Sequence, residues 1–339
     1  MDKTFKTAKE QGRDETFDVM RGICVLAMTV HHCINYFPGY SLFYWRFVSG
    51  TFPFLAGYLV TSVLVGMATA VPDRNHLGWR LLLRGLKLIA LCVVLNATLI
   101  FLLPVGHKGK LMSAFGLIEN VVLFGDYKTV SFSLLVPIGY TIALGGGLLL
   151  LRMMRLKVIL ILGLALFGYC TLAEEFIGRK EYYLIFLSIG VFGMAAGYAS
   201  DWISRKVLST TWYAVAPWLV MQALITALGK SEIYPIYCAN TMASLLFISF
   251  IARLGIKWRV DLRLLILLGR YSLLLYLAQI ATVVVLQITF REFALGAGLT
   301  GFWIAILLVC FAQVLIATET DWLRKRYPFS DRVYGWVFR

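Results

Sequence analysis

Four ionisable side chains lie in one apolar stretch near the start of the chain: Asp18, Arg21, His31 and His32. Arg21 and His32 are 11 residues apart. On an ideal helix this spacing is within about 20° of three full turns, so the two side chains share one face and lie roughly 16 Å apart along the axis. Asp18 is three residues before Arg21 on that face, where a carboxylate can hold the guanidinium. An imidazole that titrates near neutral pH can remove a proton from a hydroxyl group, so this face could carry general-base chemistry.

The two histidines are not equivalent, because adjacent residues on a helix point about 100° apart. We favour His32 as the base, since it shares the face of Arg21, and keep His31 as the second candidate. The alternative is that these four groups only hold one another in a structural network.

A second polar pattern lies late in the chain, where Ser272, Tyr276 and Gln279 follow Arg270 at i, i+4, i+7 spacing. This spacing places the three side chains on one face of a helix. They form either a hydrogen-bonded seam between helices or part of a cavity wall.

A third pattern is basic: Arg80, Arg84 and Lys87 also share one helix face. Such a stripe can bind the phosphates of anionic lipids or of a nucleotide-like ligand.

The amino-acid composition indicates that these groups lie in a membrane protein. Of 339 residues, 60% are hydrophobic and 15% charged, whereas about a quarter of the residues in an ordinary soluble domain are charged. The same figures exclude a disordered chain, a collagen-like repeat and a disulfide scaffold. The six cysteines lie in apolar runs without paired spacing, so we expect no metal site. We predict an all-α, multi-pass membrane protein, in which ionisable groups at membrane depth are default site candidates.

A membrane helix needs about 20 mostly apolar residues, and ten such stretches can be placed. They are 17–37, 45–70, 79–103, 129–151, 156–173, 182–199, 211–229, 234–254, 263–288 and 299–318. Residues 17–320 therefore form one ten-helix domain between an N-terminal segment, 1–16, and a basic tail, 321–339. Segment 111–126 contains Glu119 and Asn120, and we expect it to be a short interfacial or re-entrant piece.

Lysine and arginine distribute unevenly over the connections between these stretches. Counted alternately, 23 lie on the side of the two termini, eight on the other side, and Arg270 inside the ninth stretch. The positive-inside rule then predicts that both termini are cytoplasmic. The same bias and contact with anionic lipids account for the net charge of +14, so we expect no nucleic-acid partner.

The first motif resembles a known family. Asp18, Arg21 and Gly22 form an Asp-x-x-Arg-Gly motif, and His32 follows Arg21 after ten intervening residues. This arrangement in the first of ten membrane helices resembles the acyltransferase-3 family of membrane acyltransferases. The Asp-x-x-Arg-Gly opening is also similar to that of the related heparan glucosaminide acetyltransferase group.

Two further segments agree with this resemblance. The stretch 52–58 is similar to the Phe-rich Ser-Gly-Tyr segment of the family, with Ala56 in place of the serine. The stretch 268–276 is similar to its Gly-x-x-Ser-Leu-x-x-Tyr segment, and Gln279 stands nearest to a position where many members have histidine. The basic stripe on the third helix is similar to arginines of the family.

The resemblance implies transfer of an acetyl or succinyl group from cytoplasmic acyl-CoA to a hydroxyl of an extracytoplasmic or lipid-linked glycan, in the cytoplasmic (inner) membrane. His32 would act as base or carry the acyl group transiently, and Arg21 would hold the donor. The basic stripe would anchor the nucleotide. The expected substrate cavity would be lined by Gly57, Tyr58, Arg270, Ser272, Tyr276 and Gln279.

Two other classes of function remain open from the sequence: a transporter or flippase of a lipid or glycan intermediate, and a structural subunit. Transporters often contain internal repeats or paired broken helices, and neither is visible in the sequence. No sequence feature indicates an oligomeric state.

Overall fold

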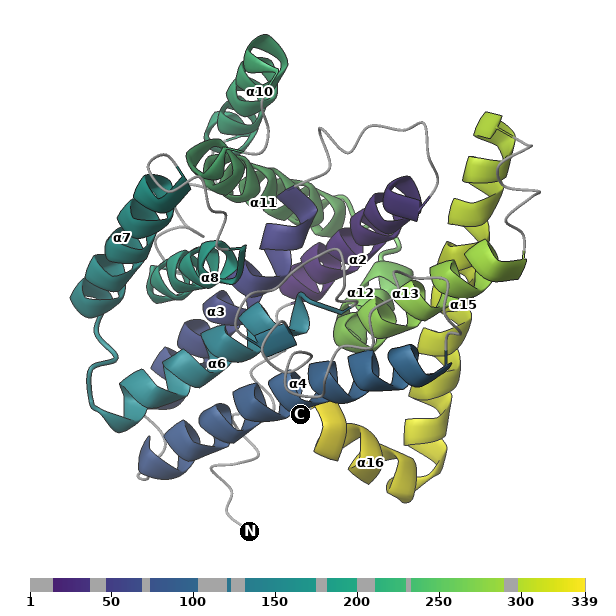
Figure 1. The fold of residues 1–339 in the computed structure, drawn as a ribbon, viewed down its shortest axis with the longest axis horizontal. Helices are drawn as coiled ribbons and strands as arrows, with labels where there is room; N and C mark the ends of the chain where they lie inside the picture. Colours follow the sequence, from purple (N-terminus) through teal and green to yellow (C-terminus); the bar gives the residue numbers. More distant parts are fainter. Residues whose placement is uncertain are drawn as a thin grey trace.

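The computed structural model describes residues 15–36, 47–68, 74–102, 121–122, 132–174, 182–199, 211–229, 233–289 and 298–338. This part of the chain is all-α, as predicted, with twelve helices (Figure 1). They are α2 (Glu15–Tyr36), α3 (Phe47–Ala68), α4 (Arg74–Leu102), α6 (Leu135–Leu150), α7 (Leu156–Leu172), α8 (Tyr182–Tyr198), α10 (Thr211–Leu228), α11 (Tyr234–Lys257), α12 (Arg263–Arg270), α13 (Ser272–Thr289), α15 (Gly298–Arg326) and α16 (Pro328–Phe338).

Several of these helices are suited to crossing a membrane. Within the described residues, four are long and apolar enough, Glu15–Ile34, Asn75–Thr98, Tyr234–Lys257 and Thr300–Arg326, and the bent pair α12–α13 would be a fifth. α15 exposes large apolar side chains about one turn apart, including Trp303, Leu307, Phe311 and Leu315. A lipid-facing helix needs such a surface. The protein is thus a multi-pass membrane protein.

The finer topology stays a prediction. Each of the ten expected stretches coincides with one helix or with the pair α12–α13, but five of these helices are shorter apolar elements. Ten crossings and two cytoplasmic termini are therefore still expectations. Segment 111–126 lies outside the described residues, except for Val121 and Val122.

Glycines bring pairs of helices into close contact. α3 lies beside α8, and α4 lies beside α6 (Figure 1). A methyl group on Gly57 would come within 1.9 Å of the carbonyl oxygen of Gly190 in α8. One on Gly85 would come within 2.4 Å of the carbonyl oxygen of Gly139 in α6. Small residues let helix backbones approach closely, which is a common way to pack helices in lipid.

Helix α2 occupies the middle of the fold and contacts α3, α11, α12, α13 and α15. Its tightest contact is with α12. A methyl group on Gly22 would lie 2.2 Å from the carbonyl oxygen of Leu265, and one on Gly269 would lie 1.8 Å from that of Asp18. The helix that carries the predicted catalytic residues is therefore fixed against α12.

The prediction of one continuous helix over 263–288 is wrong. The chain bends by 85° between α12 and α13, at Tyr271. Tyr271 is 1% exposed, and its hydroxyl donates a 2.9 Å hydrogen bond to Asp321 on α15. A tertiary contact thus holds the break, in a stretch whose sequence contains no proline.

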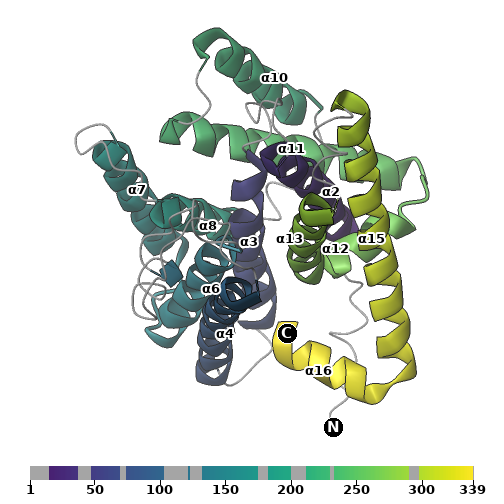
Figure 2. The ribbon, with the colours of Figure 1, turned by 45° about the vertical axis from the view of Figure 1, so that its right-hand side comes forward.

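The last elements extend further than expected. α15 continues to Arg326, eight residues beyond the expected end at 318, and the segment expected to be a tail contains α16. α16 turns away from the end of α15 and runs toward α4 (Figure 2).

Candidate functional site

The polar stripe of α13 faces α2. Arg21 Nη2 donates a short hydrogen bond to Ser272 Oγ at the start of α13. One turn further, the ring of Tyr276 lies 6.0 Å from the ring of His32, measured between centroids. Arg21 and His32 of α2 and Ser272 and Tyr276 of α13, on two helices far apart in sequence, therefore form one group.

The third residue of the stripe belongs to a buried amide cluster. Gln279 Oε1 accepts a 2.7 Å hydrogen bond from Gln313 Nε2 on α15 and lies 3.2 Å from Thr29 Oγ1 on α2. All three side chains are fully buried. This cluster is a seam between α2, α13 and α15, which is one of the two roles expected for the stripe. Thr29 and Gln313 were not predicted, although a glutamine inside an apolar stretch is a detectable signal.

The two histidines occupy different surroundings. Their rings are 5.7 Å apart and meet at 76°. His31 faces α3, where its Nε2 lies 3.5 Å from Ser49 Oγ. His32 faces α13, and its Nε2 is buried without a hydrogen-bond partner among the described residues. What distinguishes His32 is that its ring lies beside Tyr276 on α13, the helix whose Ser272 accepts the hydrogen bond from Arg21.

Asp18 is 2% exposed. Its backbone forms the contact with Gly269, so the Asp-x-x-Arg-Gly motif is also the place where α2 meets α12. Gly22 completes that contact. Part of this motif is thus explained by helix packing.

The two predicted cavity residues on α3 make packing contacts. Gly57 contacts the backbone of Gly190, as described above. The ring of Tyr58 stacks on Phe17, with 5.5 Å between centroids and 13° between planes. Tyr58 is thereby joined to the first turns of α2, whereas Gly57 points to α8.

The basic stripe lies on an exposed face of α4. Arg80, Arg84 and Lys87 are all exposed. Lys87 Nζ lies 5.4 Å from the ring centroid of Trp336 in α16, at cation–π distance. The structure thus brings the stripe to the C-terminal helix, which the sequence did not indicate.

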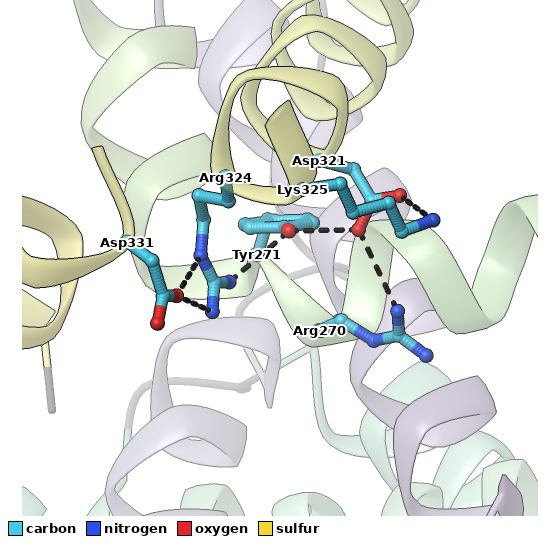
Figure 3. A network of polar contacts seen from close by, with 6 residues as sticks. All are labelled: Arg270, Tyr271, Asp321, Arg324, Lys325 and Asp331. Carbon is cyan, nitrogen blue, oxygen red and sulfur yellow. Dashed lines mark hydrogen bonds and ion pairs between the residues drawn. The ribbon is translucent and has the colours of Figure 1, made fainter. Parts of the chain in front are cut away.

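A polar network surrounds the bend between α12 and α13 (Figure 3). Asp321 of α15 accepts the hydrogen bond from Tyr271, forms an ion pair with Lys325 at 2.6 Å, and lies 3.6 Å from Arg270 Nη1. Arg270, predicted as a cavity residue, therefore pairs with α15. Its Nε is buried without a hydrogen-bond partner in the described part of the chain. The side chain of Asp321 is only 18% exposed.

The network continues into α16 through Arg324. Its Nε and Nη2 donate to Asp331 Oδ1 at 2.9 and 2.6 Å, and its Nη1 donates to Tyr271 at 3.1 Å (Figure 3). Its guanidinium carbon lies 4.2 Å from the ring centroid of Tyr334. Asp331 and Tyr334 were not predicted, because nothing in the local pattern shows that the chain folds back after Tyr327.

The described residues contain no group of three histidine, cysteine or acidic side chains that could hold a metal ion. No protein-family model matches this sequence, and no curated protein is significantly similar to it.

Proposed function

We propose that this protein is a membrane acyltransferase in which His32 is the general base. The observation that carries the proposal is the buried Nε2 of His32, without a hydrogen-bond partner among the described residues, beside Tyr276. Buried polar atoms are nearly always hydrogen-bonded, and a catalytic role is one of the recognised explanations for an exception. The resemblance of the α2 motif to the acyltransferase-3 family supports the same reaction.

In the proposed reaction, an acceptor hydroxyl gives its proton to His32 Nε2 as its oxygen attacks the thioester carbonyl carbon of acyl-CoA. A carbon–oxygen ester bond forms and the carbon–sulfur bond breaks. The departing thiolate of CoA receives the proton from the imidazolium, which restores the neutral base. A positioned base of this kind typically contributes about 10²–10⁴-fold in rate.

The donor would be held by cationic side chains. Arg21 would contact the phosphates or pantetheine of acyl-CoA, and Arg80, Arg84 and Lys87 would bind the nucleotide end. The exposure of these three side chains favours contact with an external anion. Anionic lipid is the competing ligand for the stripe.

The acceptor would be a hydroxyl of an extracytoplasmic or lipid-linked glycan, and the donor acetyl- or succinyl-CoA. With both termini in the cytoplasm of an inner-membrane protein, donor and acceptor would approach from opposite sides. This arrangement requires transport of neither molecule.

The test compares His32→Asn with His31→Asn in the purified, reconstituted protein. Transfer of a labelled acetyl or succinyl group is measured on envelope glycans, and the product is identified by the mass of one added acyl group. We expect His32→Asn to lose about 10²–10⁴-fold in rate and still bind acyl-CoA, while His31→Asn keeps most of its activity. If both variants and the double variant remain active, the base is not a histidine of α2.

A transporter or flippase is the second candidate, because one structural feature favours it. The 85° bend between α12 and α13 is the kind of interruption that transporters use at their binding sites. If the unaltered protein binds no acyl-CoA but moves a lipid-linked glycan across proteoliposomes, this alternative replaces the acyltransferase.

A further inference from the structure

The C-terminal helix α16 has two different faces. Phe329, Val333 and Trp336 are spaced i, i+4, i+7 and are 75%, 44% and 72% exposed. At 100° per residue these three side chains fall within about 60° of one another. They are called the apolar face of α16 below.

The opposite face of α16 is attached to the rest of the protein. On an ideal helix, Asp331 lies about 170° and Tyr334 about 130° from the centre of the apolar face. Asp331 accepts the two hydrogen bonds from Arg324, and the ring of Tyr334 meets that of Tyr271 at 5.5 Å. Because these contacts fix the rotation of α16, the apolar face is directed away from Tyr271. At one end of this face Trp336 also meets Lys87 of α4, 5.4 Å from its ring centroid, and is still 72% exposed.

We propose that α16 lies in the plane of the membrane interface, with its apolar face among the lipid headgroups and upper acyl chains. Short amphipathic helices with aromatic residues on one face and cations beside them bind the interface in this way. Tryptophan in particular is enriched at that depth.

Continuity with the membrane-spanning surface identifies lipid as the occupant. α16 begins two residues after the end of α15, whose candidate span runs to Arg326. The exposed apolar surface of α15 continues to Trp322 and Leu323, and then to Phe329 on α16. A helix that follows a span directly and stays apolar on its outer side is still in contact with the bilayer.

Charge gives a second argument for lipid. From Asp321 to the end, the chain has five basic and two acidic residues. Both acids, Asp321 and Asp331, already pair with cations of the network. Arg332 is exposed about 70° from the centre of the apolar face, where an arginine can reach anionic headgroups while its stem stays in the interface.

The experiment measures depth in the full-length protein, reconstituted into vesicles of phosphatidylcholine and phosphatidylglycerol. Single cysteines replace Phe329, Val333 or Trp336 and carry an environment-sensitive fluorophore. Asp261→Cys, in the exposed turn before α12, is the matched control. The background is Cys310→Ser, since the other five native cysteines are buried.

We expect all three labels on the apolar face to emit at shorter wavelength than the control and to lose quenching by aqueous iodide. Phosphatidylcholine brominated near the top of its acyl chains should quench them, and should leave the label at 261 unaffected. Iodide quenching equal to that of the control would overturn the proposal. Protection from iodide without quenching by brominated lipid would also overturn it, because protein, such as a second copy of the chain, would then cover this face.

Discussion

The contact between α2 and α12 can be tested by adding one methyl group. In Gly269→Ala, the new Cβ would lie 1.8 Å from the carbonyl oxygen of Asp18, whereas ordinary contacts begin at 3.4 Å. The obstructing atom belongs to a helix backbone, which cannot rotate away as a flexible side chain can. The two helices must therefore separate by more than an ångström.

The magnitude follows from two opposing effects. Alanine is preferred to glycine in a helix by about 0.5–1 kcal/mol. Forcing extra volume into a packed contact costs about 1–3 kcal/mol, and more where backbone must move. We expect Gly269→Ala to be destabilising by about 1–2 kcal/mol in net terms. Gly168→Ala in α7 is the matched control, because nothing lies within 4 Å of the added methyl group, so only the favourable helix preference acts.

The assay is thermal denaturation of each purified full-length variant in one detergent, followed by the fraction that remains monodisperse. We expect the midpoint of Gly269→Ala to fall below that of the unaltered protein, and the midpoint of Gly168→Ala to equal or exceed it. Gly22→Ala adds a methyl group to the same contact from α2, where its Cβ would lie 2.2 Å from the carbonyl oxygen of Leu265. It should behave like Gly269→Ala. Equal midpoints for Gly269→Ala and Gly168→Ala would refute the close approach of α2 and α12.

Three further results are expected. Arg84→Glu should raise the KM for acyl-CoA about ten- to a hundredfold, since a lost charge-assisted contact costs about 1.5–3 kcal/mol; unchanged donor affinity would leave lipid as the ligand of the stripe. Cysteine labelling near Lys230 should succeed from outside the cell, and labelling near Arg155 only from the cytoplasm, and the reverse would overturn the positive-inside assignment. Asp331→Asn should accelerate backbone hydrogen exchange in α16. The free energy that holds α16 in place should fall by only about 0.5–1 kcal/mol, because Asp331, the partner of Arg324, is 43% exposed. Unchanged exchange would mean that the ion pair does not hold α16.

Helix positions could be read from the sequence because they depend on local composition. The expected stretches 156–173 and 182–199 correspond to Leu156–Leu172 and Tyr182–Tyr198. The expected continuous stretch 263–288 failed, because its interruption depends on Tyr271 bonding to Asp321, 50 residues away. A hydropathy pattern cannot predict a contact between residues so far apart in sequence.

The sequence likewise predicted one part of the candidate site and not another. Periodicity alone places Ser272, Tyr276 and Gln279 on one side of their helix, and Arg21 and His32 on one side of another. Periodicity does not say which two faces meet. It also could not show that Gly57 would lie against the backbone of Gly190.

By itself, the sequence determined that the chain is helical, apolar and built for a membrane, and which side chains share a helix face, since these properties arise within one or two turns of backbone. The tertiary structure decided what each face meets. It brought Ser272 to Arg21, left the Nε2 of His32 buried beside Tyr276, and turned the C-terminal residues into a helix docked on Tyr271. These contacts join segments separated by tens to hundreds of residues. They depend on how closely glycines such as Gly269 let neighbouring helices approach, and packing of that kind is a property of the whole fold.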